Sequence, residues 1–208
     1  HGIPEGRCFA GWEDALRQDK FADCVFVCTQ DRMHFEPVMQ ALEKGYDVLC
    51  EKPMSYDRTE LIAMGEKARQ TGRVLSICHV LRYSPFFVKL KELIDSGAIG
   101  QLVSIQHIES VGYWHMAHSF VRGNWSRSED SCPMILAKCC HDTDILTWLA
   151  GSSCAAVSSF GISTPRTSRT VRRNTVWMGV YTGIAAHITR RASIWSIQRL
   201  FPMDLSLW

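Results

Sequence analysis

Two short segments of this 208-residue chain carry side chains whose types and positions suit acid–base chemistry. The first is Glu51-Lys52-Pro53, in which the Lys52 ammonium can donate a hydrogen bond to a substrate hydroxyl and stabilise developing negative charge. The second contains His141, whose imidazole changes charge near neutral pH and can therefore accept or return a proton. The alternative interpretations are an ordinary surface ion pair between Lys52 and Glu51, and a structural core histidine at position 141.

Four polar residues follow an apolar run near the beginning of the chain, namely Thr29, Gln30, Asp31 and His34. Open α/β sheets bind ligands at the carboxyl ends of their strands, so these residues are candidates for ligand contact. His34 stands where the next helix begins, and the free N–H groups of a helix beginning favour an anion. Its alternative role is capping or packing.

The nine cysteines lie mostly inside apolar runs, which predicts buried free thiols rather than disulfides. Cys139 and Cys140 precede His141, a combination that could suggest a metal ligand set. No CxxC pair occurs in the sequence, however, and structural zinc sites commonly use that spacing. We therefore expect no metal.

Up to about residue 100, short apolar runs alternate with amphipathic segments of helical length. Strands are predicted at 24–28, 48–50 and 73–78, and helices at 33–44, 59–70 and 85–96. Each of these helices is followed by a glycine, which is typical of a helix end. The alternation predicts an α/β fold, namely part of a Rossmann-type doubly wound parallel sheet whose strands are buried on both faces.

From residue 99 the pattern changes, which predicts a second, α+β domain over residues 99–161. It consists of an antiparallel strand over 102–113, a polar loop over 114–133 and a helix over 134–149. Residues 1–98 form the dinucleotide-binding part. Its first βαβ unit is expected to be missing, because no GxGxxG motif occurs and no strand is predicted before residue 20.

Four landmarks in this order resemble the Gfo/Idh/MocA family of NAD(P)-dependent oxidoreductases, which includes glucose–fructose oxidoreductase and inositol dehydrogenase. The landmarks are the turn Cys28–His34, the triplet Glu51–Pro53, the run His79–Pro85 with Arg82 and Tyr83, and the run Lys138–Asp144 followed by Trp148–Gly151. The resemblance covers about residues 1–161 and implies NAD or NADP as cofactor.

The resemblance also implies particular site residues. The residues implied to bind the cofactor are Thr29, Gln30, Asp31, His34, Glu51, Lys52, Pro53 and Arg82. The catalytic residues are Lys52 and His141, with Lys138 as a candidate because Ala137 stands where many relatives carry an aspartate. Tyr83, Trp125 and Asp144 are implied to contact the substrate. The peptide bond before Pro53 is expected to be cis, as in relatives.

The implied reaction is hydride transfer between a nicotinamide and a sugar, polyol or related hydroxy or keto compound. Family members are often homo-oligomers, and we expect a cytoplasmic protein with no nucleic-acid or membrane partner. Two alternatives stay open. The chain is an inactive truncated product that does not bind the dinucleotide, or it is an NAD-dependent glycoside hydrolase on the same fold.

The charge is divided unevenly along the chain. Residues 1–161 carry a net charge of −4, whereas residues 162–208 carry +6 and contain no lysine. We interpret 162–208 as an atypical tail, for which the hypotheses are a shifted reading frame, a divergent tail and a basic interaction tail. In a shifted frame, residues 184–197 can encode a run that resembles the cysteine-rich continuation of one branch of the family.

Overall fold

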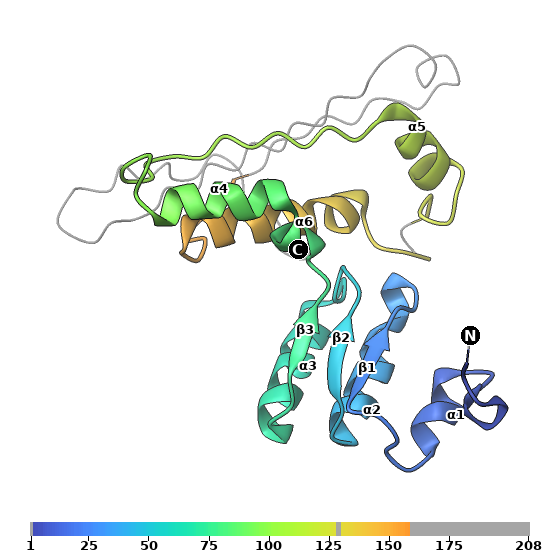
Figure 1. The fold of residues 1–208 in the computed structure, drawn as a ribbon. Coiled ribbons are helices and arrows are strands. Elements are labelled where there is room, and N and C mark those ends of the chain that lie inside the picture. Colours follow the sequence, from blue (N-terminus) through green and yellow to red (C-terminus); the bar gives the residue numbers. More distant parts are fainter. Residues whose placement is uncertain (1, 128–129, 159–208) are drawn as a thin grey trace. The chain divides into compact units, whose positions relative to one another are not determined.

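The computed structural model describes residues 2–127 and 130–158, which form two compact units (Figure 1). The first unit contains residues up to 79 together with 122–140, and the second contains 80–121 and the described residues from 141 onward. The Arg-rich tail, with all three hypotheses for it, lies outside the described residues.

The first unit is built around a parallel sheet of three strands, β1 (Cys24–Val27), β2 (Asp47–Cys50) and β3 (Leu75–Ile77), in the order β1-β2-β3. Helices α2 (Phe35–Glu43) and α3 (Arg58–Thr71) connect successive strands. Before β1 lie a short 3-10 turn, η1 (Glu5–Arg7), and helix α1 (Trp12–Arg17). The predicted α/β class is confirmed.

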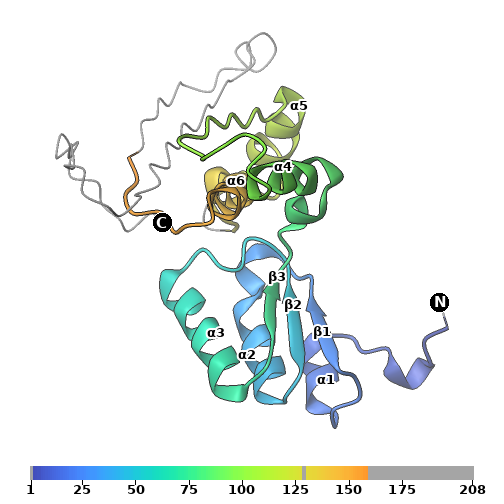
Figure 2. The same cartoon turned by 60° about the vertical axis from the view of Figure 1, so that its left-hand side comes forward.

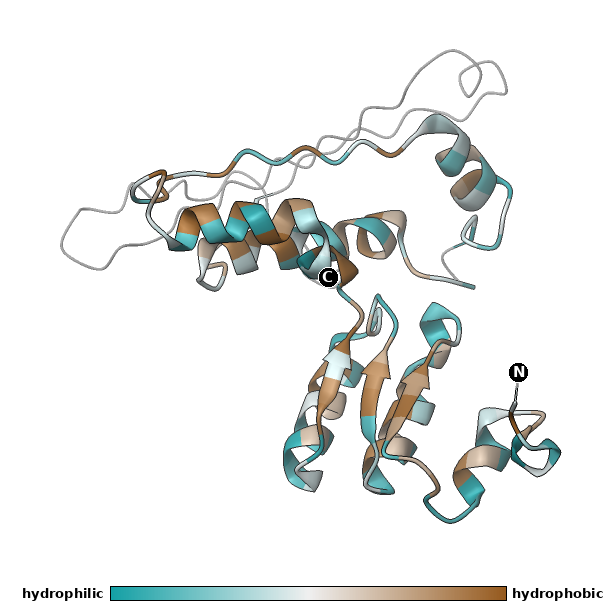
Figure 3. Ribbon diagram, viewed as in Figure 1, coloured by the Kyte–Doolittle hydropathy of each residue, from teal (hydrophilic) through white to brown (hydrophobic). Residues whose placement is uncertain are grey.

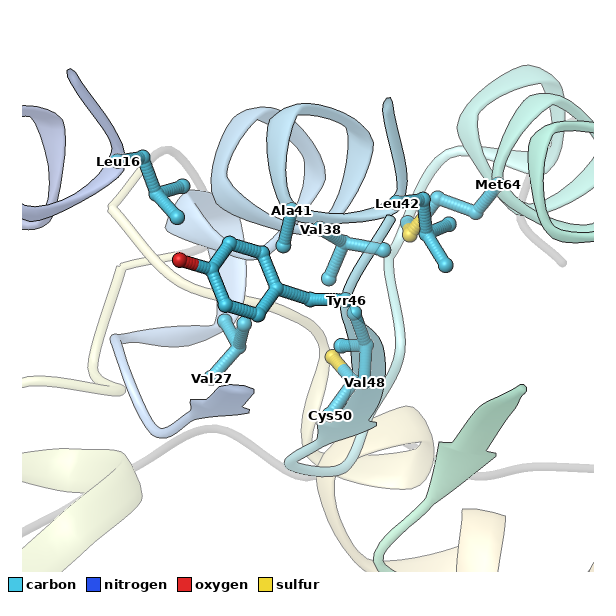
Figure 4. Packing of buried hydrophobic residues seen from close by; sticks show 9 residues of the cluster. All are labelled: Leu16, Val27, Val38, Ala41, Leu42, Tyr46, Val48, Cys50 and Met64. Carbon is cyan, nitrogen blue, oxygen red and sulfur yellow. The ribbon is translucent and has the colours of Figure 1, made fainter. Parts of the chain in front are cut away.

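The core of this unit lies between the sheet and α2 (Figure 4). Val38, Ala41 and Leu42 repeat at helical spacing on α2 and are fully buried. They pack with alternate residues of β2, Val48 and Cys50, because successive strand residues point to opposite faces. Burying a large apolar side chain such as that of Val38, Leu42 or Val48 contributes about 1.5–3 kcal/mol.

The opposite face of the sheet is open in the described part of the chain. Phe26, which pairs with Leu49 in the register, is 69% exposed. Helices α2 and α3 lie on the same side of the sheet (Figure 2), and the strands are mostly apolar, except at the beginning of β2 and within β3 (Figure 3). The prediction that the strands are buried on both faces is therefore wrong here, because no described element covers the face of Phe26.

Helix ends follow local chemistry. The Asp57 carboxylate accepts a hydrogen bond from the Thr59 amide (2.7 Å) where α3 begins, and Gly72 ends the helix at a φ of 65°. In the second unit, η3 (Val80–Tyr83) leads into α4 (Pro85–Asp95), whose N-cap is Ser84.

Helix α6 (Met134–Ala150) begins in the first unit and continues into the second. None of the helices in the described ranges has the length and apolar character needed to cross a bilayer.

Two predictions for the second unit are wrong. Residues 102–111 form no strand, since no strand among the described residues pairs with them. The alternating burial nevertheless remains, with Ile105, His107 and Glu109 half-buried between exposed neighbours. The segment predicted as a loop begins with helical turns, α5 (Tyr113–His115) and the π-helical η4 (Met116–Val121), which Phe120 anchors by burial.

Candidate functional site

The carboxyl end of the sheet gathers polar residues from neighbouring strands. The ladder continues past the strand ends, because Glu51 N donates to Val27 O (2.9 Å) and Cys78 N donates to Cys50 O (2.8 Å). This places Glu51 beside Cys78 across adjacent strands. Burial, and then the hydrogen bond with Glu51, raises the pKa of the Cys78 thiol. Cys78 is therefore a protonated thiol at neutral pH.

Lys52 is the second residue after β2, and the Lys52–Pro53 peptide bond is cis, as expected from the resemblance. The Lys52 ammonium donates to the carbonyl oxygen of Ala137 at 3.4 Å. The Glu51 carboxylate accepts a hydrogen bond from the backbone N–H of Lys52 (3.0 Å), which is a different contact from the surface ion pair considered as the alternative. Lys52 is thus half-buried, and its ammonium is directed to the beginning of α6.

His34 is a buried brace rather than an exposed anion ligand. Its side chain is 1% exposed, with Nδ1 2.9 Å from Pro53 O and Nε2 3.0 Å from Thr29 O. Carbonyl oxygens only accept, so a neutral ring satisfies one of them and a doubly protonated ring satisfies both. The structure supports the packing role of His34, which ties the turn after β1 to the turn after β2.

The Asp31 carboxylate accepts hydrogen bonds from side chains of residues 122–140, the second segment of the first unit. Trp125 Nε1 and Cys132 Sγ both lie 2.9 Å from Asp31 Oδ2. Arg32 donates to Ser131 O (2.9 Å). Burial, and then the hydrogen bond to Asp31, raises the pKa of the Cys132 thiol. Asp31, which was expected to bind the cofactor, and Trp125, which was expected to bind the substrate, therefore contact each other.

The other two residues of the turn after β1 are placed by the 3-10 turn η2 (Asp31–Met33). The Thr29 hydroxyl donates to Met33 O over 2.9 Å and so closes this turn. Gln30 is the N-cap residue of η2 and is exposed. Of the two, Gln30 has the more accessible side chain for a ligand.

In the second unit, Arg82 and Asp144 pair with each other, although they were assigned to cofactor and substrate. Nε and Nη2 of Arg82 donate to the two carboxylate oxygens of Asp144 over 2.7 and 2.6 Å. This bidentate bond raises the pKa of Arg82 further above its ordinary value. Tyr83 is 83% exposed and is accessible to a ligand.

Lys138 and His141 are half-buried residues of α6, one helical turn apart. Of the two neighbouring carboxylates, Asp142 contacts His107 and Asp144 contacts Arg82. The pair of His107 and Asp142 was missed from the sequence. The only local signal was the alternation that makes His107 half-buried, and nothing in that alternation indicates α6 as its partner.

Comparison with known proteins settles the family. The profile of the Gfo/Idh/MocA oxidoreductase family, NAD-binding Rossmann fold, matches residues 2–79. The profile of the Gfo/Idh/MocA C-terminal domain matches residues 87–196, which is more than half of the chain. The chain belongs to the Gfo/Idh/MocA oxidoreductase family. The second match extends past residue 161, where the resemblance expected from the sequence ends.

Individual relatives agree with this assignment. Inositol 2-dehydrogenase of Corynebacterium glutamicum strain R is 26% identical over 166 residues, covering 79% of this chain and 45% of that protein. Inositol 2-dehydrogenase/D-chiro-inositol 3-dehydrogenase of Lactiplantibacillus plantarum is 28% identical over 150 residues, covering 71% and 39%. The chain thus spans less than half the length of these curated relatives.

A solved structure shows the same fold. The inositol dehydrogenase homologue from Azotobacter vinelandii, complexed with NAD⁺, superposes with a TM-score of 0.61 at 19% identity. The superposition covers 71% of this chain and 40% of that one. The Gfo/Idh/MocA architecture, a Rossmann-like parallel sheet with helices, is therefore shared in three dimensions.

Proposed function

We propose that the protein to which this Gfo/Idh/MocA chain belongs is an NAD(P)-dependent dehydrogenase or reductase acting on a polyol, sugar or related hydroxy or keto compound. The observation that carries the proposal is the position of Lys52, a half-buried ammonium at the carboxyl end of the central strand of a parallel sheet. Ligands of open α/β sheets bind at this end. The inositol dehydrogenases among the relatives support the substrate class.

The donor set at the carboxyl end of the sheet suits the nicotinamide side of a dinucleotide. The turn after β1 presents Gln30, and Glu51 and Lys52 follow the end of β2, so hydrogen-bond donors and acceptors occupy neighbouring positions. The 208 residues contain no GxGxxG motif, and we therefore assign no pyrophosphate contact to this chain. Bound NAD(P) would supply the hydride acceptor or donor.

Each proposed catalytic residue has one task. The Lys52 ammonium donates to the oxygen of the reacting carbon and stabilises the negative charge that develops there. The His141 imidazole takes the hydroxyl proton in the oxidation direction and returns it in the reduction direction, so that hydride and proton leave the substrate together. Lys138 lies one turn before His141 and next to Ala137, the position where many relatives carry an aspartate, and it supplies positive charge there.

The test uses NADH absorbance with a panel of inositols, other polyols and sugars. Lys52→Met should lower kcat by about 10²–10³-fold, because it removes a donor to the developing oxyanion. Lys44→Met is the matched control, since the Lys44 ammonium also donates to a backbone carbonyl, Gln18 O at 2.6 Å, but lies at the end of α2. Equal loss in both variants would contradict the proposal.

Two further measurements separate the alternatives. Fluorescence titration with NADH asks whether the chain binds the dinucleotide, and absence of binding favours the inactive product. Release of an aglycone from a glycoside without net NADH formation favours the glycoside hydrolase. His141→Asn should lower kcat by about 10²–10⁴-fold with NADH affinity unchanged, which distinguishes proton transfer from cofactor binding.

A further inference from the structure

Three side chains of the second unit, none of them proposed as catalytic, converge on one point. A ring nitrogen of His107 and carboxylate oxygens of Glu109 and Asp142 all lie within 4.8 Å of one another. We propose that these residues form a binding site for a first-row divalent cation. The site is independent of the proposed dehydrogenase function, because none of the three residues has a role in that reaction.

The backbone prepares this convergence. His107 and Glu109 are two positions apart in the extended segment 102–111, so their side chains leave the same side of the backbone. Both are half-buried, whereas the adjacent Gln106, Ile108 and Ser110 are exposed. Asp142 comes from α6, and its side chain is only 7% exposed. One side of an extended segment and one helix therefore supply the three ligand atoms.

The charges and lone pairs of this cluster suit a divalent cation. The carboxylates of Glu109 and Asp142 lie within 4.8 Å of each other and repel, and screening by water is reduced because the Asp142 side chain is only 7% exposed. The His107 ring contacts the Asp142 carboxylate directly, and a protonated ring would offset one negative charge. A divalent cation would offset both charges and would accept a lone pair from all three side chains.

The ligand types select the class of metal. One imidazole nitrogen and two carboxylate oxygens suit manganese, iron or zinc, whereas magnesium and calcium prefer oxygen alone. No thiolate takes part, so the absence of CxxC spacing in the sequence does not bear on this site. Three protein ligands leave positions for water. Because His107 and Asp142 are 35 residues apart, a bound ion would also tie the extended segment to α6.

The experiment titrates the full chain with Mn²⁺ and follows the electron paramagnetic resonance signal of free Mn²⁺. Manganese is the first probe because it prefers oxygen and nitrogen to the thiols of the nine cysteines. We expect one ion per chain, displaced by Zn²⁺. Glu109→Gln and His107→Gln should each weaken binding by at least about tenfold, since removing even an outer-shell partner of a metal costs that much.

Glu92→Gln is the matched control, because Glu92 is an exposed carboxylate of α4 in the same unit. It should leave Mn²⁺ affinity unchanged. Glu109→Gln keeps the contact between His107 and Asp142, so it tests the site even if changes at Asp142 impair folding. Mn²⁺ should also raise the Tm of the unchanged chain but not that of His107→Gln. Absence of Mn²⁺ binding, or equal affinity in Glu109→Gln and the unchanged chain, would overturn the proposal.

Discussion

The Trp125 indole N–H donates to the Asp31 carboxylate over 2.9 Å, although the two residues are 94 positions apart. Cys132 contacts the same oxygen of Asp31. One oxygen of the turn after β1 therefore accepts from two residues of the segment that precedes α6. A ligand that displaces the Asp31 carboxylate must also release Trp125, so binding at the turn and the conformation of the later segment are coupled.

Asp31→Ala should loosen the segment around Trp125, because it removes both contacts to that carboxylate. We expect a loss of about 1–2 kcal/mol, which is modest because Trp125 is partly exposed. Chemical denaturation measures the loss, and limited proteolysis locates it. Asp19→Ala, at an exposed position before β1, is the control. Cleavage that is no faster near residue 125 in Asp31→Ala than in the control would contradict the coupling.

His34→Ala should destabilise the first unit by about 2–4 kcal/mol. The substitution leaves the carbonyl groups of Thr29 and Pro53 without their ring partner and opens a cavity in a fully buried place. Urea denaturation checks the value. His118→Ala, at an exposed position, should change stability by less than about 0.5 kcal/mol. Similar losses in the two variants would show that His34 is not a brace.

Cys50 should resist alkylation in the folded protein. Burial, and then the charge of Glu51, raises its pKa to about 12, so only about one thiol in ten thousand is ionised at pH 8. Iodoacetamide followed by peptide mapping should label the exposed Cys8 and Cys154 first. Denaturation should then make Cys50 react at their rate. Fast labelling of Cys50 without denaturation would contradict its burial.

Because its pKa is raised, the Cys50 thiol should also make the folded protein less stable in alkali. The pKa of Cys50 is higher in the folded state than in the unfolded state, so unfolding releases a proton when the pH lies between the two values. The stabilisation is complete below about pH 9 and is lost as the pH rises toward 12. Cys50→Ala should show a smaller fall in Tm over this range. An identical fall in both proteins would exclude Cys50 as its source.

The pair of Arg82 and Asp144 should show a coupling free energy of about 1 kcal/mol in a double-mutant cycle. Its bidentate geometry favours coupling, and the 40% exposure of Arg82 limits it. The exposed pair of Lys89 and Glu92 is the matched comparison and should couple by about 0.5 kcal/mol or less. Equal coupling in the two pairs would show that the bidentate geometry adds nothing.

Local patterns predicted the elements that depend on local chemistry. The helices α2, α3, α4 and α6 lie within a few residues of their predicted ranges, because apolar spacing and end residues act within one helix. The strand expected over 102–113 did not form, since a strand requires a partner that the same residues do not encode. The position of Lys52 at a strand end follows from the sequence, but the contacts of Asp31 and Arg82 join distant segments and leave no local trace.

Two side-chain contacts on different sides of α6 fix the rotation of this helix about its axis. Asp142 and Asp144 are two residues apart, so they project about 200° apart around the helix axis, one toward His107 and the other toward Arg82. The helix therefore cannot rotate about its axis without losing both contacts together. Insertion of a single residue before Asp142 would turn both carboxylates by about 100°. The two contacts therefore also fix the direction in which the His141 side chain leaves the helix, and a one-residue insertion would change that direction.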